Sequence, residues 1–251
     1  MTPARNPDLS RAMYDVQDQW ESQPYLLYRT DILDFFNELF RVGSKNVTFE
    51  ESVLLGALAA KAMSQASRQG HAYEIPIIAS DAKKKLKMKE SIQWARNLER
   101  NVAIKLNLVS SLINIWGIGT VDISPFYNEN GELNTETYEK GKDQFEKEVP
   151  EHDNIFKAIA LNLFMDTFLF VSLQKYNLFE FYSYFTVCLA AVQTSGYLAG
   201  LKKDDVENEF ILNTSKLSRG ISHSEKFAQI IIDALKKSEI IYPPQLACII
   251  K

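Results

Sequence analysis

Two long apolar segments that follow one another almost without a break constrain the fold of this chain more than any other feature. They span residues 154–176 and 178–201. A connection this short joins two helices only as an antiparallel hairpin. The first segment also contains Lys157, Asn162 and Asp166, and a charged residue at the centre of a bilayer costs about 2.5–3.5 kcal/mol. We therefore expect two core helices and no membrane-spanning segment.

Helix breakers are rare along the rest of the chain. The 251 residues include 10 Gly and 8 Pro, about 7% together against an average near 12%. Residues 48–51 and 222–225 each have the Ser/Thr-x-x-Glu spacing of a capping box, which opens a helix. Besides the hairpin, we predict helices over residues 8–22, 25–42, 49–69, 80–116, 135–148, 203–214 and 223–238. Residues 71–79 and 240–251 contain Pro76 and Pro243-Pro244 and are predicted to be extended.

These segments predict an all-α fold. The chain, residues 1–251, should form a single compact multi-helix domain of about eight helices, with the apolar antiparallel hairpin at its centre. Residues 117–153 are polar and contain Pro125, Gly131 and Pro150. This segment is the predicted place for a hinge or an acidic insertion.

The charge of the chain is nearly balanced overall but divided along its length. The net charge is −4, from 28 Lys and Arg and 32 Asp and Glu, which excludes a uniformly basic nucleic-acid coat. Residues 83–105 carry eight basic and two acidic side chains, whereas residues 129–153 carry nine acidic side chains and three lysines. The net charges of the two segments are therefore +6 and −6, and either segment could face a charged partner.

The acidic segment indicates a docking surface for a basic protein, with a solvated loop as the alternative. Carboxylates along one segment can take the place of the phosphates that a nuclease binds, and complementary charge accelerates association. Immunity proteins and other inhibitors of nucleic-acid enzymes use this strategy. The leading hypothesis is a non-enzymatic interaction protein, most concretely an immunity or inhibitor protein that neutralises a basic, nuclease-like toxin. The predicted partner-binding residues are Glu129, Glu132, Glu136, Glu139, Asp143 and Glu146.

The basic segment, residues 83–105, supports a second hypothesis, a nucleic-acid binder. Four of its basic side chains fall on one face of the predicted helix: Lys85, Lys89, Arg96 and Arg100. Such a stripe could neutralise phosphates, and a solvated helix face is the alternative.

Residues 219–223 extend this second hypothesis to an enzyme. The sequence Arg219-Gly220-Ile221-Ser222-His223 is similar to the motif of the HEPN ribonucleases, an all-α family in which Arg, a polar residue and His recur. Only three residues separate Arg219 from His223 here, and Gly220 stands where the family has the polar residue. The resemblance would imply an all-α ribonuclease.

Polar residues inside the apolar hairpin support a third hypothesis, a helical protein that binds a small molecule. Asn162 and Asp166 are four residues apart and so lie one above the other on a helix. On the second helix the polar residues that share a face are Tyr182, Thr186, Gln193 and Tyr197. A turn near residue 177 would bring the two polar strips together, either as a structural network or as the polar end of a pocket.

The cysteines and histidines form no recognisable site. Cys188 lies in an apolar run and Cys248 is far from it in sequence, so we expect two free thiols in a reducing compartment. None of the three histidines has a ligand at metal-binding spacing: His71, His152 and His223. The chain has no Gly-rich phosphate loop and no apolar signal segment at its start. We predict no catalytic, cofactor-binding or metal-binding residues. We favour a non-enzymatic protein and expect a cytoplasmic location.

Overall fold

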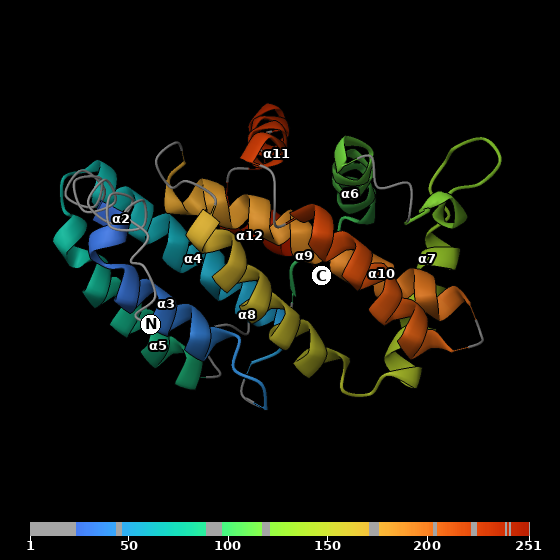
Figure 1. Cartoon of the computed structure of the whole chain (residues 1–251), viewed down its shortest axis with the longest axis horizontal. Helices are drawn as coiled ribbons and strands as arrows, with labels where there is room; N and C mark the ends of the chain where they lie inside the picture. Colours follow the sequence, from blue (N-terminus) through green and yellow to red (C-terminus); the bar gives the residue numbers. More distant parts are fainter. Residues whose placement is uncertain are drawn as a thin grey trace, which may run out of the picture.

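The computed structural model describes residues 24–43, 47–88, 97–116, 121–170, 176–202, 205–221, 225–238, 240 and 242–250. Its helices are α2 (Pro24–Leu27), α3 (Arg29–Leu39), α4 (Phe49–Arg68), α5 (Ile75–Lys87), α6 (Val102–Trp116), α7 (Thr135–Glu148), α8 (His152–Phe170), α9 (Leu178–Leu201), α10 (Val206–Ile221), α11 (Glu225–Lys237) and α12 (Pro243–Ile250). Short 3-10 turns, η1 (Ala72–Glu74) and η3 (Ser124–Phe126), connect some of them (Figure 1). The described residues form one helical domain without a strand, so the all-α prediction is confirmed.

Helix α9 is the centre of the domain. Every residue from Leu178 to Gly200 except Glu180 is buried, because α4, α6, α7, α8, α10, α11 and α12 all pack against it. A capping box starts the helix: the Asn177 side chain accepts from the Phe179 and Glu180 amides, and Glu180 accepts from the Asn177 amide. A helix buried on all sides must be apolar all round, which explains the long apolar segment in the sequence.

The helices with clear start signals have the predicted bounds. Helix α9 spans residues 178–201 and α7 spans residues 135–148, both as predicted. The capping box of Thr48 and Glu51 is present at the start of α4. Gly70 follows α4 with φ of +81°, a conformation that favours glycine.

Two predicted extended segments are helical, and proline is the reason for both errors. Residues 75–87 form α5 with Pro76 in its first turn, and residues 243–250 form α12 with Pro243 as its first residue. The first turn of a helix does not use its amide protons, so proline fits there without losing a hydrogen bond.

The long helix predicted over residues 80–116 is also wrong. Helix α5 ends at Lys87, Met88 has an extended backbone, and α6 begins only at Val102. Residues 25–42 likewise form two helices, α2 and α3, with Tyr28 between them. The predicted helix over residues 8–22 and the capping box at residues 222–225 lie wholly or mainly outside the described residues.

Helices α7 and α9 approach each other unusually closely. A Cβ atom at Gly200 would stand 2.2 Å from the backbone oxygen of Gly141, and a Cβ atom at Gly141 would stand 2.4 Å from that of Tyr197. Phe145 of α7 packs edge-on to Tyr197, with ring centroids 6.2 Å apart. The described part of the predicted hinge, residues 121–153, is therefore attached to the core through α7.

Candidate functional site

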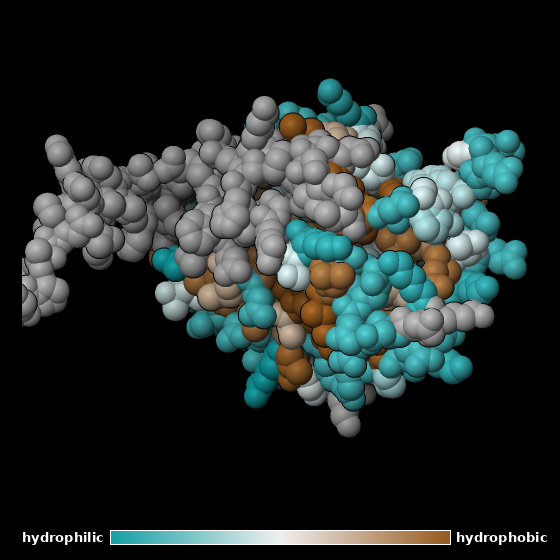
Figure 2. Space-filling model, turned by 45° about the vertical axis from the view of Figure 1, so that its right-hand side comes forward, coloured by the Kyte–Doolittle hydropathy of each residue, from teal (hydrophilic) through white to brown (hydrophobic). Residues whose placement is uncertain are grey.

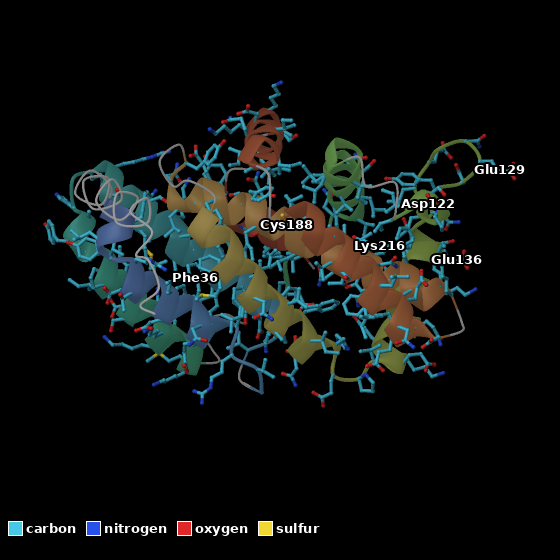
Figure 3. All side chains as sticks on the ribbon, in the orientation of Figure 1. Phe36, Asp122, Glu129, Glu136, Cys188 and Lys216 are labelled. Carbon is cyan, nitrogen blue, oxygen red and sulfur yellow. The ribbon has the colours of Figure 1, made fainter. Side chains whose placement is uncertain are left out.

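Acidic side chains of residues 122–136 lie at one end of the molecule, around the start of α7. Figure 3 shows Asp122, Glu129 and Glu136 there, whereas α3 and α5 form the opposite end of the domain (Figure 1). Figure 2, turned to bring this end forward, shows mainly hydrophilic side chains over it. The first part of the predicted acidic segment thus lies on one surface together with Asp122.

The fold explains why these carboxylates face outward. Asn134 caps α7 by accepting from the Thr137 amide, at 3.0 Å. On the helix, Tyr138, Gly141 and Phe145 recur at spacings of three and four and are buried. The apolar stripe is turned towards α9, so Glu136 on the other face is exposed.

The structure divides the six predicted partner-binding residues into two groups. Glu139 forms an ion pair with Arg100, at 2.8 Å, and Glu146 forms one with Lys142, at 3.2 Å. Asp143 is exposed, but Lys140 and Lys147 lie three and four residues from it on the same helix face. The negative charge near these three residues is therefore largely balanced within the chain.

The other three predicted residues are Glu129, Glu132 and Glu136. A fourth carboxylate, Asp122, belongs with them and was missed in the sequence. Asp122 is exposed, and it accepts hydrogen bonds from the Ser124 amide and hydroxyl, which lower the pKa of its carboxyl. Residues 121–139 contain no Lys or Arg, a signal that was available in the sequence. We define the acidic patch as Asp122, Glu129, Glu132 and Glu136, all of them exposed.

The basic segment does not form the predicted stripe. Lys85 lies on α5, Arg100 precedes α6 and binds Glu139, and Lys89 and Arg96 lie outside the described residues. Lys105, counted with this segment in the sequence, is completely buried. The prediction of a single basic helical face is therefore wrong, because α5 and α6 are separate helices.

Lys105 occupies a polar site inside the domain. Its ammonium donates to the Gln193 side-chain oxygen at 3.0 Å and lies 5.1 and 5.8 Å from the ring centroids of Tyr197 and Tyr138. Burial lowers the pKa of Lys105 from 10.5 to about 7, and the carboxylate of Glu50 opposes this effect. Near neutral pH the amine therefore exists in both its charged and its neutral form.

The prediction that Asn162 meets the polar residues of the second helix of the hairpin is wrong. Asn162 is exposed, because α8 turns Phe156, Ala160, Leu163 and Phe164 inward. It lines an open hollow of about 800 Å³ between α3 and α8. The side chain of Asp166 lies outside the described residues. The polar residues of α9 are buried as predicted, but their partners are elsewhere: Tyr182 donates to the Val53 backbone oxygen at 2.9 Å.

The remaining candidates add no reactive centre within the described ranges. These ranges contain no group of three or more His, Cys, Asp and Glu side chains that could hold a metal ion. Burial raises the pKa of the Cys188 thiol to about 12. The side chains of Arg219 and His223 in the motif similar to HEPN lie outside the described residues. Among the described helices, none has both the length and the hydropathy that crossing a membrane requires.

Comparison with known proteins identifies one relationship. Neither the curated proteins nor the solved structures contain a match to this chain. One family does match: residues 42–249 correspond to the FliB lysine N-methylase C-terminal domain. This range begins shortly after α3, extends into α12 and includes both the acidic patch and the Lys105 site. The chain therefore belongs to the FliB lysine N-methylase C-terminal domain family.

Proposed function

We propose that this chain is the helical substrate-docking domain of a protein-lysine N-methylase and that its acidic patch holds a lysine-rich protein. The observation that carries the proposal is the family match over residues 42–249, in a chain that exposes the four carboxylates of the acidic patch. A methylase that acts on lysine side chains must attract a positively charged segment. Four carboxylates without Lys or Arg between residues 121 and 139 provide the complementary charge.

The exposed charges of the acidic patch should accelerate association more than they strengthen binding. An exposed ion pair contributes only about 0–1 kcal/mol, so four such pairs give a weak complex. A patch of one sign nevertheless concentrates opposite charge near the surface and can raise association rates by about tenfold or more at low salt. Fast, weak docking suits an enzyme that must release one modified protein and accept the next.

The attachment of the patch to the core also supports docking. Glu136 is in the first turn of α7, and the Gly141 and Gly200 backbones hold α7 against α9 without intervening side chains. The loop before α7 is closed by hydrogen bonds from the amides of Asn130 and Glu132 to the Asn128 side chain, at 3.0 and 2.8 Å. A preorganised surface loses less conformational entropy when a partner binds.

The test is a charge reversal in the chain's own host. The double variant Glu129→Lys/Glu132→Lys should reduce N-methyl-lysine in cellular protein at least fivefold, measured by mass spectrometry after total hydrolysis. The matched control is Asp34→Lys/Glu74→Lys, which makes the same charge change at the opposite end of the domain. It should leave the N-methyl-lysine content unchanged. An unchanged content after deletion of the whole chain would refute the proposal.

The nuclease-inhibitor hypothesis stays a prediction that uses the same surface. It differs in its partner, because an inhibitor would bind a basic nuclease and leave lysine methylation unaffected. Deletion of the chain would then release nuclease activity in the host, and the double variant Glu129→Lys/Glu132→Lys would do the same. The deletion experiment therefore separates the two functions with one set of strains.

A further inference from the structure

Hydrogen-bond donors outnumber acceptors around the Lys105 ammonium. The Lys105 site consists of Lys105 on α6, Tyr138 on α7, and Gln193 and Tyr197 on α9, all of them buried. An ammonium group has three protons to donate, and one of them is donated to the Gln193 side-chain oxygen, at 3.0 Å. Among the residues that the structure describes, the ammonium donates to no second oxygen, and its other polar contacts are with the ring faces of Tyr197 and Tyr138. The site is therefore short of acceptors.

Two more donors of the same site have no partner. The Gln193 side-chain nitrogen and the Tyr138 hydroxyl are both buried without a hydrogen bond. The Gln193 amide cannot be turned round to relieve this, because its oxygen must face the ammonium. Burial raises the pKa of the Tyr138 hydroxyl, so the hydroxyl keeps its proton and remains a donor. Buried donors without acceptors cost free energy, and one acceptor placed among these groups would reduce that cost.

The ammonium also has no negative partner in contact with it. Within the described ranges no carboxylate forms an ion pair with Lys105. Burial lowers the pKa of Lys105 to about 7; Glu50 on α4 and Glu139 on α7 oppose this effect from a distance, whereas Arg100 and Lys142 add to it. A partner that completes the site must therefore supply negative charge as well as acceptor capacity.

A monatomic anion meets these demands better than water does. Water accepts hydrogen bonds, but it brings two protons that need acceptors of their own, whereas a halide ion only accepts. The large buried side chains of Lys105, Tyr138 and Tyr197 enclose the site, so a ligand here must be small. The Gln193 nitrogen belongs to the amide whose oxygen binds the ammonium, so one ion can contact both nitrogens.

We infer that the Lys105 site binds a chloride ion, held by the Lys105 ammonium, the Gln193 side-chain nitrogen and the Tyr138 hydroxyl. The ion supplies acceptor capacity and charge where α6, α7 and α9 meet, so it stabilises the folded chain. It binds only the protonated amine. Because the pKa of Lys105 is about 7, binding is strong at pH 6 and is lost at pH 9. The site is separate from the acidic patch and does not depend on the proposed docking function.

The test measures the stability of the intact chain in two salts. Urea denaturation compares sodium chloride with sodium gluconate at equal ionic strength, because gluconate is too large for the site. Chloride should raise the ratio of folded to unfolded protein by about tenfold or more at pH 6, relative to the general salt effect measured at pH 9, where the amine is neutral. Equal salt effects at the two pH values would overturn the inference and leave water as the partner of the donors.

Two lysine variants separate this site from the other buried ammonium. Lys105→Met should show only the general salt effect at pH 6, and a full chloride effect in this variant would also overturn the inference. The matched control is Lys157→Met, which removes a fully buried ammonium that is paired with Asp153. This variant should keep the chloride effect. Broadening of the chloride NMR signal by the unmodified chain, but not by Lys105→Met, would show the binding directly.

A pair of phenylalanine variants tests the site without removing the ammonium. Tyr138→Phe should be at least as stable as the unmodified chain in gluconate, because the hydroxyl it removes has no partner, and it should lose most of the chloride effect. Tyr184→Phe removes another buried hydroxyl, about 14 Å along α9 from Gln193, and should keep that effect in full. Circular dichroism confirms that the variants are folded. An equal chloride effect in both variants would contradict the assigned role of Tyr138.

Discussion

Replacing Lys105 by Met should make the protein more stable at low pH, although it removes a hydrogen bond from the core. In the unfolded chain the amine has a pKa of 10.5, whereas burial lowers its pKa to about 7 in the folded protein. Between these two values the unfolded state binds more protons than the native state, so the free energy of unfolding rises with pH. Below pH 7 both states are protonated, and the full cost of burying the charge remains.

The size of the effect follows from the two pKa values. A fall from 10.5 to about 7 corresponds to about 5 kcal/mol of lost stability at pH 6, at about 1.4 kcal/mol per tenfold change in proton affinity. The same relation leaves a loss of about 2 kcal/mol at pH 9. Lys105→Met also deprives the Gln193 oxygen of its donor, which costs about 1–3 kcal/mol. The variant should therefore be about 2–4 kcal/mol more stable at pH 6 and about equally stable at pH 9.

Urea denaturation of Lys105→Met and of the unmodified chain at pH 6, 7, 8 and 9 tests this prediction. Groups that titrate equally in both proteins cancel in the difference between their free energies of unfolding. The matched control is Lys157→Met, which also removes a fully buried ammonium. Lys157 forms an ion pair with Asp153 at 2.7 Å and donates to the Val47 backbone oxygen at 2.6 Å. This variant should lose about 1–3 kcal/mol at pH 7. A constant difference between Lys105→Met and the unmodified chain across the pH range would refute the argument.

Three further predictions concern the helix contacts. Thr48→Ala removes the N-cap of α4 and should lower the free energy of unfolding by about 1 kcal/mol, measured by urea denaturation. Thr48→Ser keeps a capping hydroxyl and should retain most of the lost stability. Gly200→Ala places a methyl group against the Gly141 oxygen and should lower the melting temperature by several degrees, whereas an unchanged value would contradict the close approach of α7 and α9. Tyr182→Phe removes the hydroxyl bound to the Val53 oxygen and should cost about 1 kcal/mol; an equally stable variant would mean that this bond is absent.

Local signals predicted the parts of the fold that depend on local structure. The predicted bounds of α9 and α7 agree with the structure, in which Asn177 and Asn134 cap the first turns of these helices. Pro76 and Pro243 misled the prediction because a proline that stops one helix and a proline that starts the next look alike in sequence. Only the hydrogen bonds of the neighbouring turns distinguish the two cases.

The candidate site could be predicted only as a segment. Which carboxylates remain exposed without a cationic partner depends on contacts between distant residues, such as the pair of Arg100 and Glu139. The burial of Lys105 depends in the same way on Gln193, which lies 88 residues away. Asp122 could have been found, because the stretch without Lys or Arg begins before Glu129.

The enclosure of α9 has a consequence for the order in which the protein is made. During synthesis α9 is complete at Leu201, but α10, α11 and α12, which cover part of its surface, follow in the next 50 or so residues. At about 5–20 residues per second, the ribosome needs roughly 3–10 s to supply them. For that time the nascent chain exposes an apolar helix that would associate with other nascent chains. A chaperone that binds the chain should therefore act within this interval, and a chain that terminates before α12 should aggregate even though it contains α9.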